Sequence, residues 1–362
     1  MTTEKQRYEL LDGLRGIAMA AVMIEHFGGL PIKYFGFGYF GVDLFFVLSG
    51  FLITGILLKC RGKSFGENLW VFTGRRAMRI FPLYYALLAV LFLLNYRGVR
   101  TNIVPLATYT WNYYCIGADP FYLWSLSVEE QFYLFWPIVI LALRGSRRYM
   151  LAVVVLLTAA SYYQLLYGTV EWLSKFNYTG LPNRMGSLCV GAIAAILVAD
   201  GKDRFGYLKK SRLLEILSLI AILLSGMSMR SESGIVSSFR AAYPVMALGS
   251  VILIVKCATR NGCSGLLTKL LSQRFLVQFG RLSYAIYLVH VPLGEWLRNT
   301  IIGPLWHQIP FEALGPFSFL RWQSWLLVLP SVTISSFLLS MASWHLLERP
   351  LSDLKERWFR SA

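Results

Sequence analysis

Charged residues are scarce in this sequence. Asp, Glu, Lys and Arg make up 15% of its 362 residues, whereas hydrophobic residues make up 56%. No long polar block could fold as a soluble domain, and several stretches reach the roughly 20 apolar residues that cross a bilayer as a helix. This composition excludes an ordinary soluble protein. It predicts an all-α, polytopic membrane protein that forms one domain over residues 1–362, with no separate soluble domain.

Cysteine is rare, and the common motifs of soluble enzymes are missing. The cysteines are odd in number and include no CxxC pair, so we expect neither a disulfide framework nor a structural metal site. GxxxxGK[ST], GxSxG and HExxH do not occur, which excludes P-loop NTPases, hydrolases with a nucleophile elbow and zincins. The cysteines are Cys60, Cys115, Cys189, Cys257 and Cys263.

The apolar stretches predict about ten transmembrane helices around a central cavity. Residues 103–116 are a further candidate, for a re-entrant segment. The first residues, 1–16, lack the pattern of a cleaved signal peptide, so we expect the first span to be retained. The predicted spans are 14–28, 38–58, 80–96, 123–143, 149–167, 184–200, 213–229, 239–256, 283–302 and 324–346.

The positive charge is distributed unevenly between the predicted loops. With the N-terminus in the cytoplasm, the inner segments hold 26 of the 35 Lys and Arg residues. This asymmetry predicts that both termini are cytoplasmic in a plasma (inner) membrane. The membrane topology therefore explains the net charge of +16. We expect the lipid bilayer as a partner and no nucleic-acid partner.

The first span carries ionisable residues at both ends. Arg15 and His26 in YELLDGLRGIAMAAVMIEHFG should lie roughly 16 Å apart and within about 20° of one helix face. Ionisable residues inside an apolar span are costly and mark functional sites. We interpret His26 as a catalytic candidate, against the alternative of an imidazole packed beside its partner.

Acidic residues in two further spans are the expected partners of His26. The topology places Asp43 in the second span and Glu129 in the fourth at the depth of His26, and a buried carboxylate needs a partner. Either could fix the tautomer of the imidazole, whereas the adjacent Glu130 points about 100° away. The pair Ser49–Gly50 is better explained by close helix packing.

Two other spans carry polar residues at helical spacing. Arg76 and Arg79, at i and i+3, form a suitable fork for phosphate or pyrophosphate, although positive-inside anchoring also explains arginines at this place. Tyr284, Tyr287 and His290 share roughly one face in the inner half of the ninth span, which indicates the wall of a cavity.

The start of the fourth span follows an aromatic outer segment, residues 97–122. An interfacial aromatic belt is the first explanation of this segment, and saccharide stacking is the second. On the second explanation, Trp124, Ser127 and Glu130 would contact a substrate that arrives from outside.

The chain resembles the membrane acyltransferase-three family in an ordered set of motifs. They fall within residues 8–143 and 283–351, and they are DGLRGIAMAAVMIEH, FFVLSGFLIT, RRAMRIFPLYY, WSLSVEEQFYLFWP, SYAIYLVHVP and a terminal ERP. The family moves acyl groups, usually acetyl from acetyl-CoA, onto hydroxyls of sugars in polysaccharides, lipopolysaccharides and glycolipids. The resemblance implies a ten-helix domain with Arg15 and His26 as its Arg and His, and with Arg76 and Arg79 as its Arg-x-x-Arg pair.

Some members of this family add an extracytoplasmic esterase-like domain. This sequence ends at Ala362, soon after the ERP motif, and so resembles the stand-alone members. We therefore expect an O-acetyltransferase that uses acetyl-CoA without a metal and has a glycan or glycolipid as acceptor. Whether a separate protein passes the acetyl group on is left open.

The chemistry of acyl transfer suits these residues. It needs a base for the acceptor hydroxyl and a polar cradle for the oxyanion, and His26 could be that base or an acylated relay. Asp43 or Glu129 would orient it, and the donor would be held by Arg15, Arg76, Arg79, Tyr287 and His290. The competing prediction is a proton-coupled transporter or flippase for a sugar-like or anionic substrate, although no inverted repeat is visible.

Overall fold

Helices form wherever the sequence has long apolar runs. A computed structural model describes residues 2–29, 35–60, 64–176, 178–199, 211–229, 236–259, 263, 265–311 and 323–359, and these ranges contain helices and turns but no β-strand. The longer helices are α1 (Thr2–Phe27), α2 (Phe37–Lys59), α3 (Phe65–Leu93), α5 (Trp124–Leu143), α6 (Arg147–Tyr167), α8 (Leu181–Val198), α10 (Arg212–Ser228), α11 (Val236–Ala258), α14 (Ser283–Leu297) and α16 (Trp325–Ser343). The shorter ones are α4 (Ile103–Ala107), α7 (Glu171–Ser174), α12 (Gly265–Leu271), α13 (Arg274–Arg281), α15 (Gly303–His307), α17 (Arg349–Trp358), the 3₁₀ turns Trp111–Tyr113 and Phe121–Leu123, and the π turns Arg298–Ile302 and Trp344–Glu348.

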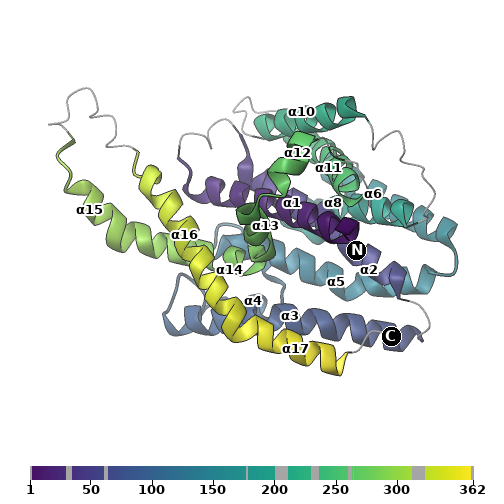
Figure 1. Cartoon of the computed structure of the whole chain (residues 1–362), viewed down its shortest axis with the longest axis horizontal. Helices are drawn as coiled ribbons and strands as arrows, with labels where there is room; N and C mark the ends of the chain where they lie inside the picture. Colours follow the sequence, from purple (N-terminus) through teal and green to yellow (C-terminus); the bar gives the residue numbers. More distant parts are fainter. Residues whose placement is uncertain are drawn as a thin grey trace.

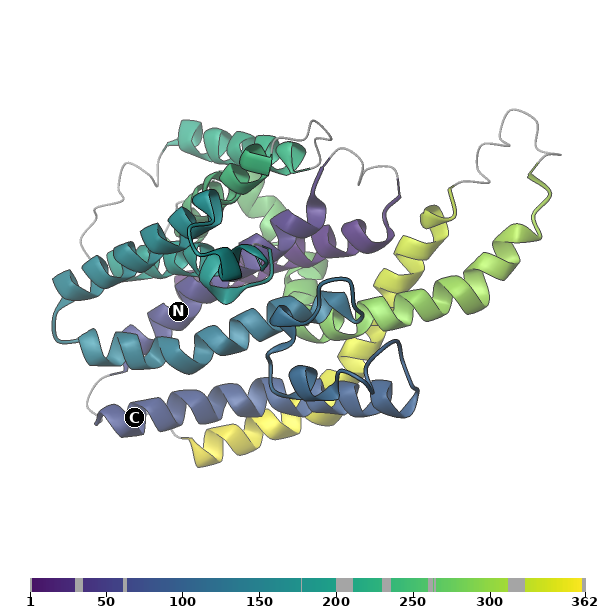
Figure 2. The ribbon, with the colours of Figure 1, turned by 180° about the vertical axis from the view of Figure 1, so that it is seen from behind.

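Many of the long helices, among them α1, α3, α5 and α6, run along the long axis of the molecule, and α16 crosses it obliquely (Figure 1). Both termini lie toward the same end, which we call the terminal end, and the opposite end is the loop end (Figures 1 and 2). Helix α1 starts at the terminal end, so Arg15 lies partway along the bundle and His26 lies near the loop end. Helix α14 runs in the same direction beside α1, because Arg15 contacts its first residue and His26 contacts its eighth.

Seven helical segments of the described chain are long and apolar enough to cross a membrane. They comprise α2, α3, α5 with its preceding turn, α6, α8, the part of α11 from Arg240, and α16 with its continuation. The chain is therefore a polytopic, all-helical membrane protein, as predicted. Each of the ten predicted spans falls on a helix, but α1, α10 and α14 do not meet these criteria. The predicted re-entrant segment contains α4 and a 3₁₀ turn instead of a span.

Glycines bring the backbones of four helices into close contact. A Cβ atom at Gly50 of α2 would collide with the carbonyl of Leu188 in α8, and one at Gly191 of α8 would collide with Val47. On the other side of the bundle, a Cβ atom at Gly280 of α13 would collide with the backbone of α1 at Asp12. Small residues allow this close approach in membrane helices. The prediction of a packing role for Gly50 is confirmed.

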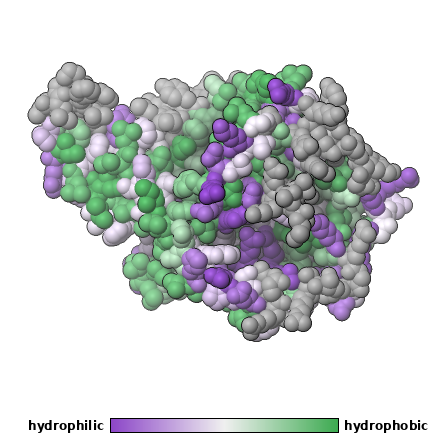
Figure 3. Space-filling view, viewed as in Figure 1, coloured by the Kyte–Doolittle hydropathy of each residue, from purple (hydrophilic) through white to green (hydrophobic). Residues whose placement is uncertain are grey.

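Two regions of one face of the molecule differ in the hydropathy of their surface residues (Figure 3). Hydrophobic side chains cover the region of α14, α15 and the start of α16, as expected of a surface in contact with lipid (Figure 3). Hydrophilic side chains gather in the middle of the same face, between α1 and α17 (Figure 3). This polar region leads into the cavity described next.

Candidate active site

A cavity of about 710 Å³ extends from the terminal half of the bundle into its interior. Its outer part is lined by Tyr8 and Asp12 of α1, Arg281 of α13 and Ser352 of α17, and its inner end by Ser125 and Tyr287. A volume of this size lies within the range of small-molecule and cofactor sites. Further polar residues of its walls come from α2, α3, α5 and α14.

Three arginines from two helices converge on this cavity. Arg15 donates to Ser283 Oγ over 3.1 Å, and Arg76 lies over the ring of Tyr133 with 4.2 Å between the guanidinium carbon and the ring centre. Arg79 lies one turn further along α3, on the same wall, and is exposed. The helix-face argument from the sequence thus agrees with the observed arrangement. Guanidinium groups suit phosphate as a ligand, because their forked N–H groups match its oxygens.

Two acidic residues of α5 line the same cavity. Glu129 Oε1 accepts a hydrogen bond from Ser49 Oγ over 2.7 Å, and Ser49 is also hydrogen-bonded to the Tyr133 hydroxyl over 2.8 Å. Glu130 faces the cavity from the next position. The predicted pairing of Glu129 with His26 is therefore wrong in this structure, because its carboxylate is directed at α2 and the arginines.

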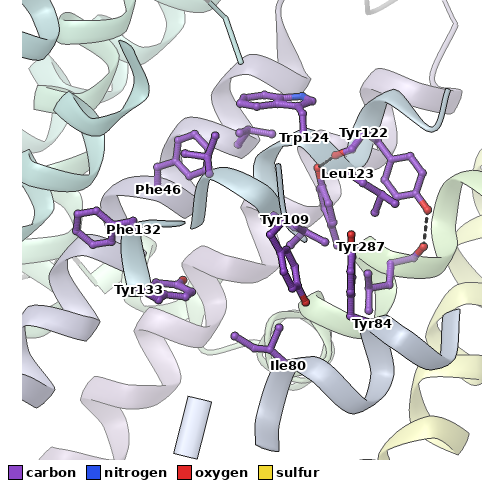
Figure 4. Packing of buried hydrophobic residues seen from close by; sticks show 14 of the residues in the cluster. Phe46, Ile80, Tyr84, Tyr109, Tyr122, Leu123, Trp124, Phe132, Tyr133 and Tyr287 are labelled. Carbon is purple, nitrogen blue, oxygen red and sulfur yellow. Dashed lines mark hydrogen bonds between the residues drawn. The ribbon is translucent and has the colours of Figure 1, made fainter. Parts of the chain in front are cut away.

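Tyr287 forms part of the inner end of the cavity. Its hydroxyl donates to the carbonyl of Tyr122 over 2.6 Å (Figure 4). The same hydroxyl is hydrogen-bonded to Ser125 Oγ over 2.7 Å. Its ring centre lies 5.4 Å from that of His290. Tyr287 therefore separates the cavity from the imidazoles of α14 and α1.

His26 lies beyond this wall, close to the end of α1. Its Nδ1 lies 2.9 Å from the carbonyl of Val22, and the side chain is exposed. Because a carbonyl oxygen can only accept, Nδ1 carries the proton and Nε2 keeps its lone pair. The tautomer is thus set by the backbone of the same helix, and not by the carboxylates that the sequence suggested.

His290 is fully buried against His26. The two ring centres are 5.0 Å apart in an edge-to-face arrangement, and His290 Nδ1 lies 2.7 Å from the carbonyl of Tyr287. The sequence placed His290 with the donor-binding residues in the inner half of its span. The structure instead places it beside His26, and His290 is not among the described residues that line the cavity, although its ring contacts that of the lining residue Tyr287.

Asp43 has a partner that sequence reasoning missed. Its Oδ1 accepts from Arg184 Nη2 over 3.1 Å and from Ser187 Oγ over 2.6 Å, and both charged side chains are at most 1% exposed. The guanidinium of Arg184 also lies 4.0 Å from the ring centre of Tyr243. The predicted pairing of Asp43 with His26 is therefore wrong. Arg184 could have been suspected, because it is a lone cation at the edge of an otherwise apolar span.

The three residues expected to contact a substrate from outside are placed differently. Trp124 is 2% exposed and packs on Tyr178, with 4.6 Å between ring centres, and Ser127 is fully buried. Glu130 faces the arginine-lined cavity. These positions correct the sequence prediction, since neither Trp124 nor Ser127 presents its side chain to an incoming molecule.

The described residues contain no cluster of three or more His, Cys, Asp or Glu that could hold a metal ion. All five cysteines are free thiols, and the Sγ atoms of Cys257 and Cys263 lie 3.2 Å apart.

Comparison with known proteins identifies the family. Residues 8–345 match the family described as Acyltransferase domain. The chain belongs to the acyltransferase-three family. The resemblance inferred from the ordered motifs is thereby confirmed.

Relatives of this acyltransferase-three chain include longer proteins. A protein of Staphylococcus aureus (strain COL) is 29% identical over 327 residues, which cover 83% of this chain and 53% of the relative. The O-acetyltransferase OatA of Staphylococcus aureus (strain NCTC 8325 / PS 47) is 27% identical over 321 residues, or 81% of this chain and 51% of OatA. The chain thus spans about half the length of the curated relatives it matches. No solved structure matches it.

Proposed function

We propose that this protein is a membrane O-acyltransferase that moves an acyl group, most simply acetyl, from acyl-CoA to a sugar hydroxyl in a cell-surface polysaccharide, lipopolysaccharide or glycolipid. The observation that carries the proposal is the arrangement of an arginine-lined cavity on one side of Tyr287 and an exposed imidazole with a free Nε2 on the other. Acyl transfer between an anionic donor and a hydroxyl acceptor uses both features.

The donor would bind in the cavity. Arg15, Arg76 and Arg79 would hold the phosphates of CoA, and the pantetheine arm would extend along the apolar wall toward Tyr287. The hydroxyl groups of Ser125 and Tyr287 at that end are suitable donors for a developing oxyanion. Tyr287 must move aside for a thioester to reach His26.

His26 would act as the base. Its Nε2 takes the proton as the acceptor O–H bond breaks, the oxygen bonds to the carbonyl carbon, the C–S bond breaks, and the proton then passes to the CoA thiolate. The alternative route forms an acyl-His26 intermediate first and uses the same nitrogen. Asp43 has no direct part in either route, because it is bound to Arg184 and Ser187.

The charge distribution supports one orientation. With the N-terminus in the cytoplasm, the predicted inner segments hold 26 of the 35 Lys and Arg residues, which supports a cytoplasmic terminal end and a cytoplasmic donor. The acceptor would then approach His26 from the loop end, outside the cytoplasm. The name of the relative OatA supports acetyl as the acyl group.

The test is an assay of purified protein with labelled acetyl-CoA and a panel of cell-surface glycans, read by mass spectrometry. We expect acetyl-CoA to be consumed and one class of glycan to gain acetyl groups. A protein that leaves acetyl-CoA intact, but moves protons together with a substrate in proteoliposomes, would instead be the transporter that buried Glu and His residues also allow.

The arginine pair gives a specific prediction for the donor. Replacing both Arg76 and Arg79 with alanine should weaken CoA binding about 10- to 150-fold, because the loss of one bidentate charged contact made by the pair costs about 1.5–3 kcal/mol. Binding can be measured by calorimetry in detergent. Arg75→Ala is the matched control, since Arg75 on the same helix donates to the carbonyl of Phe359. Unchanged affinity in the double variant would reduce these arginines to membrane anchors.

A further inference from the structure

A further arginine, Arg281, lines the outer part of the cavity. It is the last residue of helix α13, and its side chain is 53% exposed. Its Nε donates to Asp12 Oδ2 of α1 over 3.0 Å, and this is its only hydrogen bond among the described residues. The two Nη groups carry the other four N–H donors of the guanidinium. These donors are therefore available to a ligand in the cavity.

The packing of α13 on α1 fixes the position of this guanidinium. A Cβ atom at Gly280 would collide with the backbone of Asp12, so the last turn of α13 lies directly on α1. Asp12 precedes Arg15 by three residues and therefore lies about 4.5 Å nearer the terminal end. The ion pair with Asp12 thus holds Arg281 outward of Arg15, at the mouth of the cavity.

A second depression, of about 330 Å³, adjoins the cavity at this point. Gln278 and Arg281 line both of them. The charged residues of the depression are Arg274 and Arg281 on α13 and Glu9 on α1. A ligand that occupies the cavity can therefore extend past Arg281 toward the surface.

We propose that Arg281 binds the 3′-phosphate of CoA and makes the site prefer CoA to dephospho-CoA. The inference rests on the proposed function, in which the cavity binds CoA with its pantetheine arm toward Tyr287. CoA carries a diphosphate between this arm and the ribose, and a separate monophosphate on the 3′-oxygen of the ribose. With the diphosphate at Arg15 and its neighbours, the ribose points outward, and its 3′-phosphate reaches the mouth. The Nη groups of Arg281 suit phosphate oxygens there.

The test measures the affinity of wild-type protein and Arg281→Ala for CoA and for dephospho-CoA, by calorimetry in detergent. We expect wild type to bind CoA about 5- to 10-fold more tightly than dephospho-CoA, because a charged contact at a half-exposed site contributes less than a buried one. Arg281→Ala should lose this preference through weaker binding of CoA alone. Its affinity for dephospho-CoA should stay the same, since that ligand lacks the group that Arg281 contacts.

Two variants separate the contact from other effects of the substitution. Arg148→Ala also removes one positive charge, and Arg148 is exposed at the start of α6 and is not among the described residues that line the cavity. Asp12→Asn breaks the ion pair but leaves the guanidinium of Arg281 in place. Both variants should keep the preference for CoA. Arg281→Gln replaces Arg281→Ala if the alanine variant does not fold.

The comparison can contradict the inference in several ways. If wild type binds the two ligands equally, or if Arg281→Ala keeps the preference or weakens both ligands alike, Arg281 does not recognise the 3′-phosphate, while the proposed function stands. Loss of the preference in Arg148→Ala or Asp12→Asn would also overturn the inference, since net charge or the ion pair would then be the cause. If wild type binds neither ligand and consumes no acetyl-CoA, the proposed function itself fails, and the inference fails with it.

Discussion

Replacing His26 with alanine should lower acetyl transfer about 10²- to 10⁴-fold, while the protein stays folded and still binds CoA. The loss follows from the position of Nε2, which keeps its lone pair because Nδ1–H donates to the carbonyl of Val22. CoA binding should persist, because Arg15 lies eleven residues earlier on the same helix, roughly 16 Å away. The measurements are product formation by mass spectrometry and CoA affinity by calorimetry.

His307→Ala is the matched control for this variant. His307 lies in α15 and is exposed, and it is not among the described residues that line the cavity. Its loss should leave transfer unchanged. Near-normal acetylation by the His26→Ala protein would remove His26 from the mechanism altogether.

The second large effect concerns stability. Asp43→Asn should lower the free energy of unfolding by about 3–5 kcal/mol, because Arg184 is 1% exposed and would keep a buried charge without its counter-charge. Removing both charges, with Asp43→Asn and Arg184→Met together, should restore part of the loss. Unfolding in mixed detergent micelles measures both variants.

Asp119→Asn provides the comparison for an exposed ion pair. The pair of Asp119 with Arg97 is 3.3 Å long, with about half of each side chain exposed. Exposed pairs contribute at most about 1 kcal/mol, so this variant should stay close to wild type. If Asp43→Asn is no more destabilising than Asp119→Asn, the buried pair does not hold α2 to α8.

The sequence predicted the helices well because each span is a local property of composition. It also predicted that Arg76 and Arg79 share a face, since a separation of three residues fixes their relative direction within one helix. The convergence of these arginines with Arg15 followed from their common depth. These features depend on distance along the chain and on hydropathy alone.

The sequence did not predict which side chains on different helices form pairs. Asp43 and Glu129 were expected beside His26 because the three residues have the same predicted depth in the membrane. Which helices are adjacent decides the actual partners: Asp43 is bound to Arg184 on α8, and Glu129 is bound to Ser49 on α2. His290 was expected near the donor because it falls in the inner half of the predicted span 283–302. The contact of His290 with His26 depends on how far α14 is shifted along α1, which no sequence pattern records.

The ion pair between α2 and α8 also sets a condition on how the protein is made. Asp43 and Arg184 are 141 positions apart, so α2 leaves the ribosome long before its partner helix exists. A carboxylate at the centre of an inserting helix costs about 2.5–3.5 kcal/mol. Asp43 is the seventh of the 23 residues of α2, so its cost is lower, and the otherwise apolar helix can still insert. During synthesis, α2 therefore lies in the bilayer without the partner of Asp43 until α8, which carries Arg184, is inserted. These two helices can pair only after α8 has been translated, and α8 ends at Val198 of the 362 residues.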